Sequence, residues 1–155
     1  MISKKLFLAA VLIAGLTAAP RAAGACSCTG EVSFAQAVSS SQEIYIGTVV
    51  DVRSAAPEYP YMVWARLAVS QHWKGSPGDT ASVLTGENSA ICGLDFVPGE
   101  DYLVYAQAYS SQGDLFTHLC SRSHHTWEGD PDPSALDAST PVVRRSWGAL
   151  KLHYR

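Results

Sequence analysis

The sequence contains little that would suit it to bind nucleic acid or to span a membrane. Its basic residues are scattered, and no cluster exceeds the pair Arg144–Arg145. Its one long apolar run, residues 6–16, is too short for a spanning helix, which needs about 20 apolar residues. G-x-S-x-G, phosphate-loop and H-E-x-x-H motifs are also absent. We therefore expect no nucleic-acid partner, no membrane-spanning helix, no cofactor and no enzymatic activity.

Residues 1–25 have the three parts of a secretory signal peptide. Lys4 and Lys5 precede the apolar run, and the small residues Ala23-Gly24-Ala25 form a cleavage site. We predict that the mature chain begins at Cys26 and is secreted, either outside the cell or into a periplasm. An uncleaved anchor is one alternative. Lipid attachment at Cys26 is another, although Ala23 stands where such signals usually have leucine.

The mature chain is the size of one domain and is mildly acidic. Residues 26–155 hold eight basic and fourteen acidic residues, which gives a formal net charge of −6. A chain of this length can bury a modest hydrophobic core.

All four cysteines lie in this mature part, which predicts two disulfides in an oxidising compartment. A bond between Cys26 and Cys28 is disfavoured because a one-residue spacer strains the bridge. The two remaining pairings both join this N-terminal segment to Cys92 and Cys120. A zinc site is the alternative, but Cys-x-Cys without a second close pair is a weak zinc pattern.

Five segments rich in β-branched and aromatic residues predict strands. They span residues 43–53, 61–73, 80–85, 101–108 and 114–120. Gly47 lies inside the first of them and indicates a bulge. Short strands without helices between the later ones favour a closed antiparallel barrel or a sandwich, so the fold is predicted to be all-β.

The segments flanking these strands are less regular. Residues 32–41 predict a short helix or a turn. Residues 124–133 predict a solvated loop, because the neighbouring His124 and His125 lack the i, i+4 spacing of a helical metal site. Apolar residues between Val142 and Leu150 are spaced for a short C-terminal helix.

The mature N-terminus carries the chemistry of most interest. Two disulfides would hold the first and third residues, whereas chain ends usually fray. A free α-amino group and the carbonyl of the same residue can chelate a metal through a five-membered ring. They could thereby displace the activated water from the zinc of another protein. The alternative is that the bridges only stabilise a small secreted domain.

Several short motifs together resemble one known family. They are Cys26-Ser27-Cys28, Phe34-x-x-Ala37, Ile44-Tyr45-Ile46-Gly47-Thr48-Val49, Trp73-Lys74-Gly75, Cys92-Gly93, Tyr102-Leu103-Val104-Tyr105 and Leu119-Cys120-Ser121-Arg122. In this order they resemble the inhibitory domain of tissue inhibitors of metalloproteinases, in the one-domain form of bacterial netrin-like proteins. The resemblance covers residues 26–123 and leaves residues 124–155 as a C-terminal extension.

The resemblance implies a five-stranded OB-type antiparallel barrel with short flanking helices. It also implies the disulfides Cys26–Cys92 and Cys28–Cys120, and a zinc metalloprotease as the partner. The amino nitrogen and carbonyl of Cys26 would bind the zinc of the target protease. The protease would be contacted by further residues near this end: Ser27, Thr29, Gly30, Ala90 and Ile91. A binding module of the cell envelope on the same barrel, without inhibitory activity, is the alternative function.

Overall fold

The computed structural model describes residues 26–28, 30–110 and 112–139. The predicted signal peptide and the helix predicted after Val142 lie outside the described residues. Within the described part of the chain, no helix is long and apolar enough to cross a bilayer.

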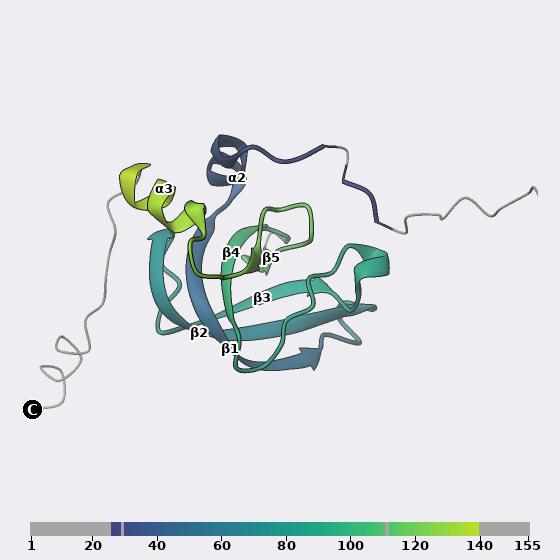
Figure 1. Cartoon of the computed structure of the whole chain (residues 1–155). Helices are drawn as coiled ribbons and strands as arrows, with labels where there is room; N and C mark the ends of the chain where they lie inside the picture. The colour runs from purple at the N-terminus through teal and green to yellow at the C-terminus, as the bar shows by residue number, and fades with distance from the viewer. Residues whose placement is uncertain (1–25, 29, 111, 140–155) are drawn as a thin grey trace, which may run out of the picture.

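Five strands form a closed barrel (Figure 1). They are β1 (Glu43–Ser54), β2 (Met62–Lys74), β3 (Thr80–Gly86), β4 (Asp101–Ala108) and β5 (Leu115–Phe116). β1 pairs with both β2 and β4, and β5 lies between β4 and β3. These pairs are antiparallel except the closing pair of β3 with β5, which is parallel at Leu84 and Phe116. The predicted all-β, OB-type barrel is confirmed.

The long first strand can pair on both sides because it bends, as the sequence predicted at Gly47. The register of β1 with β2 shifts between Ile46 and Gly47. A Cβ on Gly47 would lie 2.9 Å from the carbonyl oxygen of Ala68, which is too close for any larger residue. Glycine therefore permits the close approach of the two strands at this bend.

The apolar residues of the strands fill two cores. Alternate residues of β1 to β4, such as Tyr45, Leu67 and Val83, fill the barrel interior. A second cluster, which includes Trp73, Leu103 and Leu136, lies between the barrel wall and the helices. β4 separates the two cores, which explains why five consecutive residues, 102–106, are all buried.

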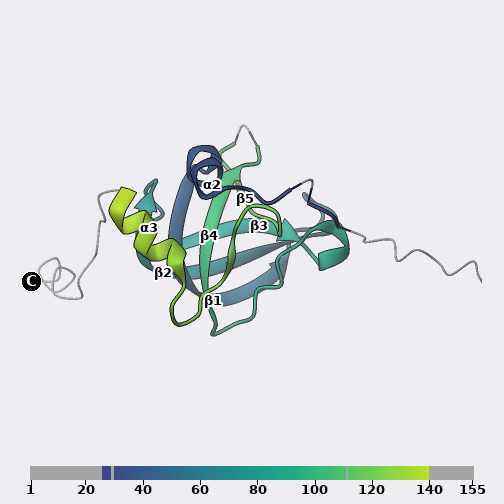
Figure 2. The ribbon, with the colours of Figure 1, turned by 45° about the horizontal axis from the view of Figure 1, so that its top comes forward.

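Two short helices lie on the same side of the barrel (Figure 2). α2 (Phe34–Ser40) shows that the short helix or turn predicted for residues 32–41 is a helix. Ser33 begins it with a capping box, because its hydroxyl accepts from the Gln36 N–H and the Gln36 side chain accepts from the Ser33 N–H. α3 (Pro131–Ser139) buries Leu136 completely against the second core.

Two predictions about the later part of the chain are wrong in part. The fifth strand was predicted to span residues 114–120, but only Leu115 and Phe116 are strand, because the chain turns sharply after Thr117. Residues 124–133 were predicted to be a loop, but His124–His125 form the short strand β6 on the edge of β4, and α3 begins at Pro131. Asp130 starts this helix, since its side chain accepts from the Asp132 N–H at 3.0 Å.

Candidate functional site

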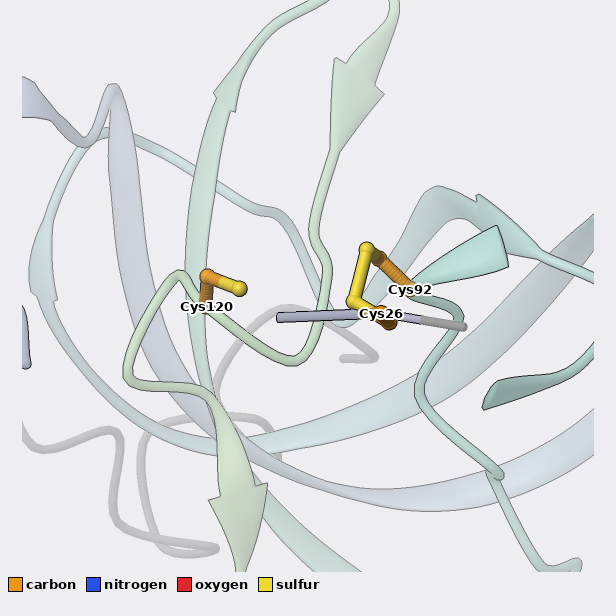
Figure 3. A group of neighbouring side chains, drawn as sticks. All are labelled: Cys26, Cys92 and Cys120. Carbon is orange, nitrogen blue, oxygen red and sulfur yellow. A yellow bond between two sulfur atoms is a disulfide. The ribbon is translucent and has the colours of Figure 1, made fainter. Parts of the chain in front are cut away.

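Two disulfides hold the N-terminal tripeptide of the described chain against the barrel. Cys26 is bonded to Cys92 and Cys28 to Cys120, as the family resemblance implied, with Cα–Cα distances of 5.2 and 5.6 Å. Ser27 lies between the two anchors and is exposed. Figure 3 shows the Cys26–Cys92 bond with Cys120 beside it. We call residues 26–28 with these two bridges the N-terminal tip.

The tip is not a structural zinc site. The sulfur atoms of Cys26, Cys92 and Cys120 lie within 4.8 Å of one another. However, all four cysteines lie in the described residues and none of them is free. Zinc binds the thiolate form, which a disulfide sulfur does not offer. The zinc-site alternative for the four cysteines is therefore wrong.

A tightly built loop presents Cys92 to the tip. The 3-10 helix η1 (Ser89–Ile91) is capped by Asn88, whose side chain accepts from the Ala90 N–H at 3.0 Å. Cys92 then adopts a left-handed backbone, with φ 62°. Gly93 lies so close to the strand that a Cβ there would be 2.0 Å from the carbonyl oxygen of Gly86. Cys92 therefore anchors the tip, and the position that follows it accepts only glycine.

A buried cluster of hydroxyl groups shapes the loop that presents Cys120. The Thr117 Oγ1 lies 2.7 Å from the Ser121 Oγ and 2.6 Å from the Ser123 Oγ, and all three residues are almost fully buried. The Ser123 hydroxyl also accepts from the Tyr105 N–H at 2.7 Å. These bonds replace the strand pairing that ends after Phe116, and they fix the turn to β4.

The two cysteine loops are joined to each other beside the tip. The Leu119 N–H donates to the Cys92 carbonyl at 3.0 Å. The Cys120 N–H donates to the Nδ1 of His118 at 3.1 Å, so that nitrogen carries no proton. Burial also lowers the pKa of His118, which favours the neutral ring. The two loops that hold the tip are therefore hydrogen-bonded to each other.

The structure brings most of the predicted contact residues to this end of the barrel. The Cys26–Cys92 bond places Ser27 near Ala90 and Ile91, both of which are exposed. Gly30 lines a groove with Leu119 and the two cysteines of the Cys28–Cys120 bridge. Thr29 lies outside the described residues.

Sequence reasoning missed Leu119, an exposed apolar residue of this groove. Ile91 and Leu119 are 46% and 42% exposed, so two apolar side chains remain uncovered on the loops that carry the anchors. Leu119 precedes Cys120 as Ile91 precedes Cys92, and this parallel position was the available signal.

An ion pair behind the groove was also missed. Arg122 donates from Nε and Nη2 to the two carboxylate oxygens of Asp132, both at 2.6 Å, and from Nη1 to the Val32 carbonyl at 3.4 Å. The Tyr105 hydroxyl donates to the same carboxylate at 2.9 Å. This network ties the chain just after the tip to α3 and β4. No sequence pattern indicated the network, because α3 itself was not predicted.

The electrostatics of this network favour a charged Asp132. Burial would raise the pKa of Asp132, but the hydrogen bonds from Arg122 and Tyr105 and the charges of Arg122 and His124 outweigh burial and lower it. The pKa of Tyr105 is raised, first by burial and then by the charge of Asp132. The network therefore consists of a carboxylate, a guanidinium and a neutral phenol.

Comparison with known proteins adds no relative, since neither a protein-family model nor a curated protein matches this chain.

Proposed function

We propose that this protein is a secreted inhibitor of zinc metalloproteases that binds the zinc of its target through the amino nitrogen and carbonyl oxygen of Cys26. The observation that carries the proposal is the double clamp of the N-terminal tip, with Ser27 exposed between two disulfides. A clamped chain end loses little conformational entropy when it binds. The proposal requires signal cleavage before Cys26.

The surroundings of the tip support binding to another protein. Ile91 and Leu119 offer exposed apolar surface on the two loops that hold the tip. An apolar contact area around a fixed, polar chelating group is what a partner with a zinc-containing cleft would fit. Ser27 would then point toward the pocket beside the metal, and Ala90 would contact the cleft on the other side.

The chelation is tested by adding one alanine before Cys26 in the mature protein. The added peptide bond converts the free amine of Cys26 into an amide, which cannot bind zinc in the same way. Inhibition of the zinc protease that wild type inhibits best should therefore weaken by about 100-fold or more, which is about 2.7 kcal/mol. The inhibition constant is the measurement, and intact mass first verifies that wild type begins with an unmodified Cys26. Unchanged inhibition by the extended protein would disprove chelation.

Two controls keep this test specific. The extended protein should keep both disulfides and the wild-type melting temperature, since the addition lies outside the barrel. Replacement of Val50, which is as exposed as Ile91 but lies on β1, should leave inhibition unchanged. Absence of inhibition by wild type across a broad protease panel would favour the alternative of a binding module without inhibitory activity.

Ser27 is expected to set which proteases respond. Replacement of Ser27 by leucine should weaken inhibition of proteases with a small pocket beside the zinc, and should preserve or improve inhibition of those with a deep apolar pocket. A side chain of this size that fits the pocket, or clashes with it, changes the inhibition constant by about 10-fold to 100-fold. Inhibition constants across a protease panel measure the shift, and a uniform effect on all members would contradict the pocket role.

A further inference from the structure

The first half of β3 has one edge without a neighbouring strand in the described structure. β3 pairs along its whole length with β2, but β5 pairs with it only at Leu84. The Leu84 carbonyl points toward β5, because it accepts from the Thr117 N–H at 2.9 Å. Backbone groups alternate in direction along a strand, so those of Thr80 and Ser82 point the same way. They face the gap between β3 and the β4–β5 hairpin.

This gap is a groove with a distinct chemical character, which we call the β3 groove. Its lining includes Thr80 and Ser82 of β3, Asp114 of the β4–β5 hairpin, and Glu43 and Trp64. Asp114 is held in place, since its Oδ2 accepts from the Tyr59 hydroxyl at 2.6 Å and from the Ser110 hydroxyl at 2.8 Å. These two hydrogen bonds also lower the pKa of Asp114. The groove thus combines a free strand edge, two carboxyl groups and an indole ring.

Such a groove fits an extended segment that carries arginine. A free strand edge pairs with the backbone of an added strand, as in other cases of strand addition. Carboxylates bind guanidinium groups strongly, and an indole ring can stack on them. None of the groove residues named above belongs to the N-terminal tip.

The chain itself contains a segment of this kind. Residues 26–139 hold fourteen acidic and four basic residues, a formal net charge of −10. Residues 140–155 hold four basic residues, including Arg144 and Arg145, and no acidic residue. The charge of the chain is therefore divided sharply at the end of α3.

The last turn of α3 contacts the end of β2, the strand that leads into the β3 groove. Asp137, two residues before the end of α3, accepts from the Trp73 Nε1 at 2.7 Å and from the Gln71 side chain at 3.3 Å. β2 ends at Lys74, and Ser76 already lines the groove. Each extended residue spans about 3.3 Å, so a few residues beyond Ser139 suffice to reach it.

We propose that residues 140–155 bind in the β3 groove of their own chain, as an extended segment beside Thr80 and Ser82, with Arg144 and Arg145 toward Glu43 and Asp114. This extended form replaces the short helix that the spacing of Val142 to Leu150 predicts. The segment fills the part of the gap between β3 and the hairpin where β5 does not pair with β3. This binding goes beyond the proposed inhibition and does not depend on it.

Amide hydrogen exchange in the mature wild-type protein tests this directly. The amide protons of Thr80 and Ser82 should exchange about 10-fold or more slowly than in the double variant Arg144→Glu, Arg145→Glu, because only the docked segment protects them. The Ala81 and Val83 amides face β2, so their exchange should not differ between the two proteins. Equal exchange of Thr80 and Ser82 in both proteins would overturn the proposal.

A matched pair of variants at Ser82 separates the strand edge from the charges. Ser82→Pro removes the N–H that points into the groove and spares the bonds to β2, so protection of Thr80 should be lost. Ser82→Ala removes only the hydroxyl and should retain it. Loss of Thr80 protection in both variants, or in neither, would contradict pairing along this edge.

Two further conditions identify the occupant. Protection should weaken in 1 M salt, where the screening length falls to about 3 Å. It should not change on dilution, because the segment belongs to the same chain. Protection that disappears on dilution would instead assign the groove to a second copy. Binding of wild type, but not of the double variant, to vesicles of anionic lipid, with unprotected Thr80, would assign the segment to a membrane surface. Either result overturns the proposal.

Discussion

Replacement of Cys28 and Cys120 by serine is expected to lower the free energy of unfolding by about 4.6 kcal/mol, a large share of the stability of a domain of this size. The bridge closes a loop with a sequence separation of 92 residues. In the chain-entropy description, opening a loop of that length lets the unfolded chain gain this much free energy. Urea denaturation of the oxidised wild type and the double variant measures the difference.

The second bridge provides the matched comparison. Cys26–Cys92 closes a loop with a separation of 66 residues, and the entropy term varies only with the logarithm of loop length. Replacement of that pair should therefore cost nearly the same, about 4.4 kcal/mol. A loss of stability well below 2 kcal/mol for either pair would mean that the unfolded chain is not restrained by that bridge.

The two pairs should differ in their effect on protease inhibition, measured under conditions in which urea denaturation shows both variants to be folded. Loss of the Cys26–Cys92 bridge frees the residue that would bind the zinc. Loss of Cys28–Cys120 leaves Cys26 anchored to Cys92 and loosens only the chain from residue 28 onward. Inhibition should therefore fall further in the first variant, and the reverse order would contradict the role given to Cys26.

The barrel could be predicted from sequence because its strands carry strong local signals. The segment 43–53 is rich in β-branched and aromatic residues, and the structure extends it by one residue to Ser54. The bulge at Gly47 could be predicted in the same way, since an isolated glycine inside a strand often marks a bulge or a close approach of another backbone. These signals depend on neighbours in the sequence.

The features that were missed depend on contacts between distant residues. Thr117 continues an apolar, β-rich run, yet its hydroxyl joins those of Ser121 and Ser123 and ends the strand. His124 pairs with β4, and its Nε2 lies 2.8 Å from the Asp130 carboxylate that begins α3. Neither partner could be inferred from spacing, because the sequence does not show which polar groups become buried together.

In the candidate site, too, the residues with local sequence signals were predicted and those that depend on distant contacts were not. Cys26, Cys28, Cys92 and Cys120 were found as a set from their number and position, but the residues alone left two pairings open. The resemblance supplied the pairing that the structure has. Leu119 was missed although its position before Cys120 matches that of Ile91 before Cys92. The Arg122–Asp132 pair was missed because its two residues meet only in the folded chain.

Replacement of Asp132 by asparagine is expected to destabilise the fold by about 3 kcal/mol at neutral pH. The carboxylate is almost fully buried and accepts three hydrogen bonds, two from Arg122 and one from Tyr105. Asparagine would leave the guanidinium without its counter-charge, and breaking a buried pair usually costs about 3–5 kcal/mol. The lower figure applies because the Arg122 side chain is one-third exposed. Asp51→Asn is the matched control, because its pair with Arg66 is exposed and should contribute little.

The pH dependence of this difference identifies its cause. Because the pKa of Asp132 is lowered in the folded protein, its stabilising contribution is fully present above the unfolded pKa of about 3.9. The contribution is lost as the pH falls through the lower, folded pKa, when the carboxylate of wild type takes up a proton. Asparagine does not titrate, so the difference in unfolding free energy between wild type and Asp132→Asn should be constant from pH 7 to about 5 and should shrink toward about pH 2. A difference that stays constant over the whole range would show that Asp132 stabilises the fold through its shape and neutral hydrogen bonds, and not through its charge.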